Sequence, residues 1–191
     1  AYNTVVKTLP CTAASVVMAK DGSLWVSTEE GISRFNAETL DLEPLTLGEG
    51  IGLPVLSSGG WNPDCFCASL QSNVIYWASS KDWSINKVFK YDIDKQEASL
   101  FIDYTTDADG RALYGAALRV DQKTDCIYTS LVKGWTYNDN VVRKYSADGT
   151  QLAEYTMEAN YWFPEVFVFP DTEDPVLADF KAINLGVGEQ T

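Results

Sequence analysis

The sequence of 191 residues lacks histidine entirely. Without an imidazole there is no histidine-based catalytic triad, no histidine metal ligand and no histidine pH switch. Basic residues are also few, because 14 Lys and Arg oppose 27 Asp and Glu and leave a formal net charge of −13. A field of that sign repels phosphate backbones, so we do not expect nucleic acid as a partner.

Long apolar runs are missing as well. No stretch approaches the ~18 apolar residues that a membrane-spanning helix needs, so we expect no transmembrane segment. The glycine-rich stretch from Gly48 to Gly60 lacks the lysine and the following helix of a phosphate-binding loop, and we expect a mobile connecting loop there. With 46% apolar and 13% aromatic residues, the chain can nevertheless bury a sizeable core.

Cysteine is limited to Cys11, Cys65, Cys67 and Cys126, and no CxxC pair is present. Zinc-ribbon and thioredoxin-type sites are therefore excluded. Buried thiols and a disulfide, for instance between Cys11 and Cys65, both remain open, so the cysteines do not decide the redox compartment. The sequence starts AYNTVV, and we expect either that a signal peptide has been removed or that this is a piece of a longer protein.

What the sequence does contain is an internal repeat, found near residues 15–47, 67–102 and 116–156. Each copy has a short apolar segment, a polar turn, an aromatic segment, a loop, a segment with a basic–aromatic pair, and a second polar turn before a last segment. Trp25, Tyr76 and Tyr128 recur at spacings of 51 and 52 residues. The basic–aromatic pairs, whose aromatic members we expect in the core, are Arg34–Phe35, Lys90–Tyr91 and Lys144–Tyr145.

Short β-branched and aromatic segments between Asp, Asn and Gly residues predict strands, four to each repeat. Four antiparallel strands form one blade of a β-propeller, and stacked blades bury the faces that a single sheet leaves open. We therefore predict an all-β chain of three complete four-stranded β-propeller blades plus part of a fourth that starts near residue 165. The blades are predicted to span residues 1–170, with 171–191 as a linker or the start of a following module.

The chain ends bear on how the blades are completed. Residues 1–10 resemble an outer fourth strand without its first three, and residues 165–170 resemble an inner first strand. A segment of a larger propeller, self-association of two chains and closure of a four-bladed ring all remain open, and we favour the first. The alternative fold is a β-sandwich. Residues 111–120 also have the periodicity of a short helix, although Gly115 and their alignment with the other first strands argue for a strand.

Two stretches carry a family resemblance. Asp21–Asn36, DGSLWVSTEEGISRFN, resembles the regulator-propeller repeat of periplasmic sensor proteins, with its DG turn, aromatic strand and basic–aromatic pair. Tyr161–Pro175, YWFPEVFVFPDTEDP, resembles exported surface proteins of gut-type Gram-negative bacteria with seven-bladed propellers of the YncE and YVTN type. The later INLGVGEQT resembles the first strand of an immunoglobulin-like module. These resemblances imply export to the cell surface or periplasm, and they imply no catalytic residues.

Aromatic loops are the main candidate for function. In a propeller, loops between the second and third strands lie on the same face as the loops that join successive blades. Exposed rings there offer apolar platforms for a sugar or peptide, while amides and charged groups orient it. The alternative is that these rings fill the central channel. The candidate ligand-binding residues are Trp61, Asn62, Asp64, Trp83, Arg111, Tyr114, Trp135, Tyr137, Tyr161 and Trp162.

Carboxylates offer a second candidate chemistry. Residues 107–110, DADG, match part of a calcium loop but lack its third oxygen ligand and closing glutamate, so a plain turn explains them better. Glu165, Asp64 and Asn62 are candidates to face the axial funnel and faintly resemble the calcium site of lactonase-type propellers. Streptogramin-lyase-type chemistry is excluded because it relies on histidine. We therefore predict no cofactor, with calcium as the alternative.

The sequence as a whole predicts a non-catalytic exported propeller that binds a glycan, a peptide or a surface protein through aromatic loops on one face. The alternative is a divalent-cation-dependent hydrolase or lactonase-like enzyme that uses the funnel carboxylates.

Overall fold

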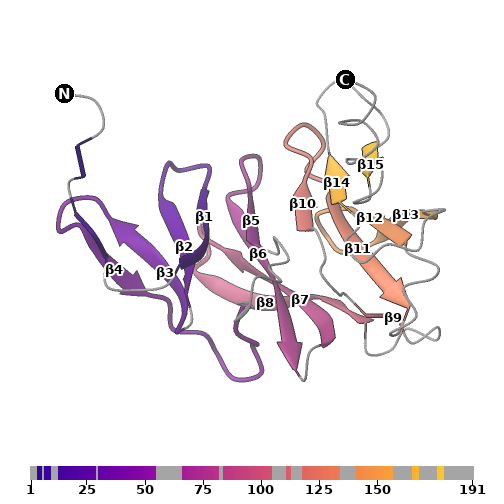
Figure 1. Cartoon of the computed structure of the whole chain (residues 1–191), viewed down its shortest axis with the longest axis horizontal. Helices are drawn as coiled ribbons and strands as arrows, with labels where there is room; N and C mark the ends of the chain where they lie inside the picture. Colours follow the sequence, from indigo (N-terminus) through magenta and orange to yellow (C-terminus); the bar gives the residue numbers. More distant parts are fainter. Residues whose placement is uncertain are drawn as a thin grey trace, which may run out of the picture.

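The computed structural model describes residues 4–5, 7–9, 13–28, 30–54, 66–81, 84–104, 111–112, 118–133, 141–156, 165–167 and 176–178. These residues form strands β1 to β15 and no α-helix (Figure 1). None of the elements in this part of the chain is therefore a helix that could cross a membrane.

Three antiparallel sheets follow one another along the chain. The first is ordered β1–β2–β3–β4, with strands Ala13–Met18, Leu24–Thr28, Gly31–Asn36 and Asp41–Pro44. The second is ordered β5–β6–β7–β8, with strands Phe66–Ser69, Val74–Lys81, Ser84–Asp92 and Glu97–Asp103. The third is ordered β10–β11–β12–β13, with strands Leu118–Val120, Ile127–Lys133, Val141–Tyr145 and Gln151–Thr156.

The remaining strands are short. Strand β9 (Arg111–Ala112) pairs with β11 outside the main order of the third sheet, and β14 (Glu165–Phe167) pairs with β15 (Val176–Ala178). Residues 111–120 thus begin and end in strands, as their alignment predicted. The all-β prediction is confirmed: the three sheets are complete propeller blades, and β14 begins a fourth.

The polar turns of the repeat have a backbone reason. The hairpin between the first two strands of each blade contains a residue with positive φ: Gly22 at +82°, Asn73 at +54° and Asp125 at +59°. Glycine adopts this left-handed region freely, and asparagine and aspartate tolerate it better than other side chains. The turn chemistry that marks the repeat in the sequence is therefore the chemistry that closes these hairpins.

The strand register explains the basic–aromatic pairs. Trp25 lies opposite Arg34, Tyr76 opposite Lys90, and Tyr128 opposite Lys144. Each basic side chain is thus the cross-strand neighbour of the repeat-defining ring, and Lys144 Nζ lies 5.5 Å from the ring centroid of Tyr128. The aromatic residue that follows each basic one points to the other face of its sheet, because side chains alternate along a strand.

Packing between successive blades buries these second aromatic residues. Between the first and second blades, the rings of Trp25 and Tyr91 lie 5.5 Å apart in a cluster with Ile32, Trp77 and Phe89. Between the second and third blades, the rings of Tyr104 and Tyr145 lie 6.4 Å apart in a second cluster. Its other members include Tyr76, Val88, Leu118, Ile127 and Leu131. Tyr91 and Tyr145 are therefore core residues as predicted, whereas Phe35 is half-buried.

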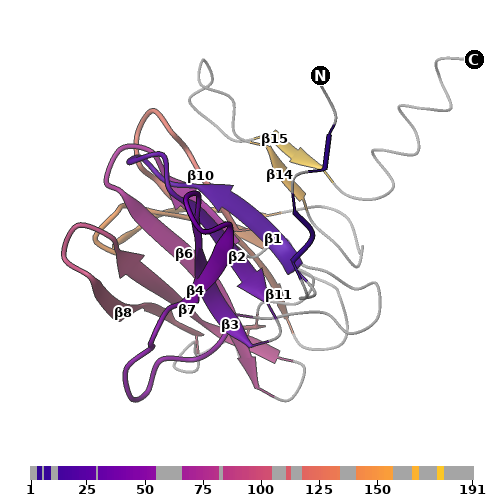
Figure 2. The same ribbon diagram turned by 90° about the vertical axis from the view of Figure 1, so that its left-hand side faces the viewer.

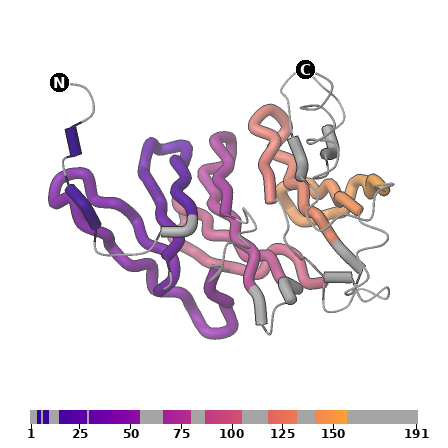
Figure 3. The backbone as a smooth tube through the Cα atoms, in the orientation of Figure 1, coloured from indigo at the N-terminus to yellow at the C-terminus, as the bar shows by residue number. Residues whose placement is uncertain are grey.

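Hydrogen bonds link the first hairpins of neighbouring blades along one edge, where Figure 3 shows these hairpins side by side. Lys20 Nζ donates to the carbonyl of Gln71 over 2.7 Å. Gln122 Nε2 donates to the carbonyl of Ala68, and Gln122 Oε1 accepts from the backbone N–H of Leu70, both over 2.7 Å. We call this edge of the blades the hairpin face.

Two details at the chain ends differ from or limit the sequence predictions. Residues 4–5 and 7–9 are not in a strand, although Lys7 forms an ion pair with Asp41 of β4. The expected outer strand needs a third strand of its own blade to pair with, and the described residues contain none.

Neither Cys67 nor Cys126 forms a disulfide, whereas Cys11 and Cys65 lie outside the described residues.

Candidate functional site

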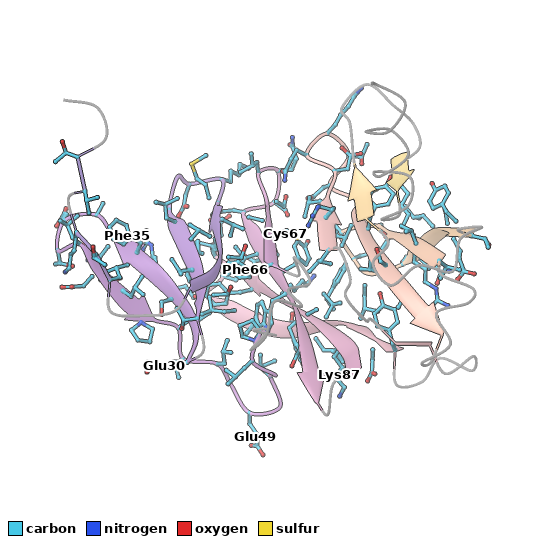
Figure 4. The ribbon with its side chains drawn as sticks, in the orientation of Figure 1. Glu30, Phe35, Glu49, Phe66, Cys67 and Lys87 are labelled. Carbon is cyan, nitrogen blue, oxygen red and sulfur yellow. The ribbon has the colours of Figure 1, made fainter. Side chains whose placement is uncertain are left out.

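Antiparallel order sends two kinds of segment out of the same edge of each blade. The loops after β2, β6 and β11 and the connectors after β4, β8 and β13 all leave opposite the hairpin face. We call this edge the connector face. Its described residues include Glu30, Glu49 and Lys87, which lie along the lower side of the molecule in Figure 4. This is the face on which the sequence predicted a ligand.

Strand β9 lies in the connector between the second and third blades and pairs with the end of β11 on this face. Arg111 pairs with Lys133 and Ala112 with Val132, so the connector from the second to the third blade runs along the end of β11. Lys133 is the last residue of β11, and Trp135 follows it by two positions. Strand β9 also contacts β7, which begins directly after Trp83. The anchor points of one inter-blade connector and two within-blade loops therefore meet at β9.

The connector between the first and second blades is anchored by the core. Trp77 Nε1 donates to the carbonyl of Gly52 over 2.8 Å, and Pro54 forms a β-bridge with Ser79. A Cβ atom at Gly52 would lie 2.8 Å from Ser79 Cβ, so only glycine lets this backbone approach β6. Gly52 and Pro54 of the predicted mobile loop therefore pack against the second blade, whereas a Cβ atom at Gly48 or Gly50 would meet nothing within 4 Å.

The turn between β2 and β3 of the first blade is stabilised by the hydroxyl group of Thr28. Thr28 is buried, and its Oγ1 accepts a hydrogen bond from the backbone N–H of Glu30 over 3.2 Å. Gly31 follows with a φ of +133°. A Cβ atom at Gly31 would lie 3.4 Å from the Leu53 side chain, so the connector of residues 45–54 also lies against the first blade.

Charge on the connector face is mixed. Glu30 and Glu49 are exposed, and Lys87 Nζ lies 3.7 Å from Asp103 Oδ2 at the point where β8 ends. Both members of this pair remain partly exposed, so it contributes little to stability. Within the described ranges, no three His, Cys, Asp or Glu residues are grouped so that they could hold a metal ion.

Two buried tyrosines are structural groups. Burial raises the pKa of the Tyr76 phenol well above its usual value, and nearby Asp125 adds to the shift. Burial also raises the pKa of Tyr104, whose hydroxyl lies 2.7 Å from Thr129 Oγ1 inside the core. Both phenols stay protonated at neutral pH and are buried in the core, although Tyr104 directly follows the end of β8.

Most predicted ligand residues lie outside the described residues, as does the DADG turn at 107–110. Arg111 is the exception, and its backbone position beside Lys133 brings it to the predicted face. The described backbone of Glu165 belongs to β14. The candidates that lie outside are Trp61, Asn62, Asp64, Trp83, Tyr114, Trp135, Tyr137, Tyr161 and Trp162.

Sequence reasoning missed two parts of this face. Strand β9 has only two residues and no alternation that could reveal it. The anchoring of Gly52 was also missed, because a glycine-rich segment is typical of a loop whether or not a tryptophan holds it. The signal that could have found it is the indole of Trp77, since a buried indole N–H requires an acceptor.

A protein-family model described as "Domain of unknown function (DUF5074)" matches residues 1–170. No curated protein matches the chain. Among solved structures, the chain is similar to the extracellular domain of a putative one-component system from B. thetaiotaomicron, with 17% identity and a TM-score of 0.52. It is also similar to puromycin hydrolase, with 17% identity and a TM-score of 0.51.

These similarities cover most of this chain but little of the others. The alignment with the extracellular domain covers 93% of this chain and 22% of that one. The alignment with puromycin hydrolase covers 87% of this chain and 25% of that one. At this level of identity the comparisons show the fold alone, and the chain spans no more than a quarter of the length of either structure.

Proposed function

The chain belongs to the DUF5074 family, and we propose that it is a non-catalytic, exported propeller that binds a glycan, a peptide or a surface protein on its connector face. The observation that carries this proposal is the position of β9. Its pairing with the end of β11 and its contact with β7 bring the anchors of three candidate-bearing segments together.

The residues at these anchors have the chemistry of a polar ligand site. Trp83, Trp135 and Tyr137 offer flat apolar rings, and Arg111 offers a planar group with several donors. Rings of this kind stack on the apolar faces of sugars or on peptide side chains, and the guanidinium fixes their orientation through hydrogen bonds. Three anchors supported by paired backbone limit how far such a platform can deform when a ligand binds.

Export is supported by the comparison with an extracellular domain and by the resemblance of Asp21–Asn36 to the repeat of periplasmic sensors. In that setting a small propeller presents its connector face to molecules outside the cytoplasm. The negative net charge favours uncharged or basic ligands over polyanions.

The test is binding of fluorescently labelled chain to arrays of immobilised glycans and unstructured peptides. We expect Trp83→Ala and Trp135→Ala each to weaken binding to the strongest array ligand at least about tenfold, since stacked aromatic contacts dominate such sites. Phe35→Ala is the control, because Phe35 is a half-buried aromatic residue on the first sheet, away from the connector face.

Three outcomes would count against the proposal. The first is an array without a ligand, and the second is binding that both tryptophan variants retain. The third is a melting temperature that rises on addition of Ca²⁺ and falls with EDTA, which would support the cation-dependent enzyme instead.

A further inference from the structure

The connector that leaves the first blade carries an apolar side chain that is not buried. Its described part, residues 45–54, contains four large aliphatic residues and runs along the lower edge of the first blade in Figure 2. Leu45, Leu47 and Ile51 pack against the core cluster that the first two blades share. Leu53 is not part of this packing, and 53% of its surface is exposed. The connector face therefore presents one leucine to the solvent.

The backbone on both sides of Leu53 is fixed. The carbonyl of Gly52 accepts the buried indole N–H of Trp77 over 2.8 Å, and Pro54 forms a β-bridge with Ser79. An exposed leucine in a flexible loop can turn inward while no partner is bound, but this one cannot do so without breaking these contacts. Its backbone is ordered before any partner binds, which lowers the entropy cost of binding.

The turn between β2 and β3 places a carboxylate beside this leucine. A Cβ atom at Gly31 would lie 3.4 Å from Leu53 Cδ2, and exposed Glu30 directly precedes Gly31. The backbone N–H of Glu30 donates to Thr28 Oγ1 over 3.2 Å, so the backbone that carries this carboxylate is also held in place.

The connector itself carries a second carboxylate. The backbone N–H of Ile51 donates to the carbonyl of Gly48 over 3.3 Å and closes a turn, in which Gly50 has a φ of +80°. Glu49 lies in this turn, is exposed, and marks the lower edge of the molecule in Figure 4. Both carboxylates therefore project from hydrogen-bonded turns of the connector face.

No cation in these two segments balances the carboxylates. Residues 28–31 and 45–54 contain neither lysine nor arginine. On the second blade, Lys87 Nζ lies 3.7 Å from Asp103 Oδ2, so that cation already has a partner. We call the exposed leucine and the two carboxylates the leucine patch, which consists of Glu30, Glu49 and Leu53.

We propose that the leucine patch binds a peptide segment that places an apolar side chain beside lysine or arginine. Such a segment covers Leu53 with apolar surface and brings cations to Glu30 and Glu49. The net charge of −13 favours the approach of a basic partner over an acidic one. This inference rests on the proposed function, because it names the ligand class of the same connector face.

The test is binding of the labelled chain to matched sets of short unstructured peptides. The first set carries leucine flanked by lysines, the second replaces the lysines with glutamates, and the third replaces the leucine with serine. We expect the first set to bind at least about tenfold more tightly than either of the others, with an affinity that falls as salt is added. Equal affinity for the first and second sets, or for the first and third, would overturn the proposal.

Substitutions in the chain locate the contact. Leu53→Ala should weaken binding of the first peptide set at least about tenfold, because it removes the apolar centre of the patch. Glu30→Gln combined with Glu49→Gln should weaken it about tenfold at low salt and remove most of its salt dependence. The matched controls are Leu70→Ala and Glu97→Gln, because Leu70 is 40% exposed, Glu97 is exposed, and both lie at hairpins opposite the connector face.

Circular dichroism and thermal melting establish that the variants fold, and the paired glutamine substitutions test the patch if Leu53→Ala does not fold. Equal effects of the patch variants and the controls would overturn the proposal.

The same measurements separate this inference from the proposed function. Peptide binding that is lost in Leu53→Ala but retained in Trp83→Ala and Trp135→Ala would support the leucine patch and count against the aromatic platform. Binding of glycans without binding of the first peptide set would overturn the leucine patch and leave the proposed function standing.

Discussion

Gly52 anchors the connector between the first and second blades at a position where a side chain does not fit. Its carbonyl accepts the buried indole N–H of Trp77, and its missing side chain leaves room for Ser79. A methyl group at this position would also lie 3.1 Å from the Phe89 ring. The backbone of β6 cannot yield without disturbing the core, so a side chain must push the connector away.

We expect Gly52→Ala to destabilise the chain by about 1–3 kcal/mol, the usual cost of overpacking. The control is Gly48→Ala in the same connector, because a Cβ atom there meets nothing within 4 Å and should change stability by less than about 0.5 kcal/mol. Urea denaturation measures both. Equal effects of the two substitutions would show that the connector does not pack as described.

Buried phenols give the chain a stability that is lost at high pH. Burial raises the pKa of Tyr104 in the folded state, so unfolding releases a group that ionises near pH ~10. This contribution is fully present below that pH, and it is lost as the pH rises above it. Each such tyrosine then removes up to about 1.4 kcal/mol per pH unit.

We expect the unfolding free energy of the wild type to fall more steeply between pH 10 and 11.5, a range chosen around the ordinary phenol pKa of ~10, than that of Tyr104→Phe. At pH 7 the variant should itself be less stable by about 1–3 kcal/mol, because Thr129 loses its partner in the core. Guanidinium titrations at several pH values measure both effects. Parallel pH curves for the two proteins would contradict this account.

The hairpins between the first two strands of each blade form hydrogen bonds that connect neighbouring blades. Gln122 lies in the hairpin between β10 and β11, yet its side chain bonds to the backbone of the second blade at Ala68 and Leu70. Its own carbonyl accepts from Gln71 Nε2 over 2.7 Å. A single glutamine therefore holds two blades in register at the hairpin face.

Gln122→Ala should cost about 1–2 kcal/mol, since it removes two side-chain bonds but leaves their partners near water. The control is Gln151→Ala, because Gln151 is exposed at the start of β13 and no side-chain hydrogen bond is found for it within the described residues. Thermal unfolding followed by circular dichroism compares them. If Gln151→Ala were the more damaging change, the role of the hairpin joint would be refuted.

The blades could be predicted from the sequence because their signals are local. Trp25, Tyr76 and Tyr128 are buried at equivalent positions, and the residues next to them form the expected strands. The pairing of β9 and the anchoring of Gly52 depend on contacts between different blades. Such contacts leave no periodic trace in the sequence, which is why the loops were predicted as a face but not as a joined platform.

At the scale of the whole molecule, the three blades differ in how many neighbours they have. The second blade packs against the first through one cluster and against the third through another, so both of its faces are covered. Within the described residues the first blade shares a core cluster with the second blade alone, and Val16, Met18 and Leu24 on its other face are exposed, although Val26 there is buried. In a repeat architecture, the stability of each unit depends on its own contacts and those with its neighbours.

This asymmetry predicts an order of local opening, which hydrogen exchange measures. Backbone amides of β2 and β3 should exchange at least about tenfold faster than those of β6 and β7, because the second blade belongs to two core clusters and the first to one. Equal protection of both blades would mean that they unfold as one unit, and that the second core cluster gives the second blade no additional local stability.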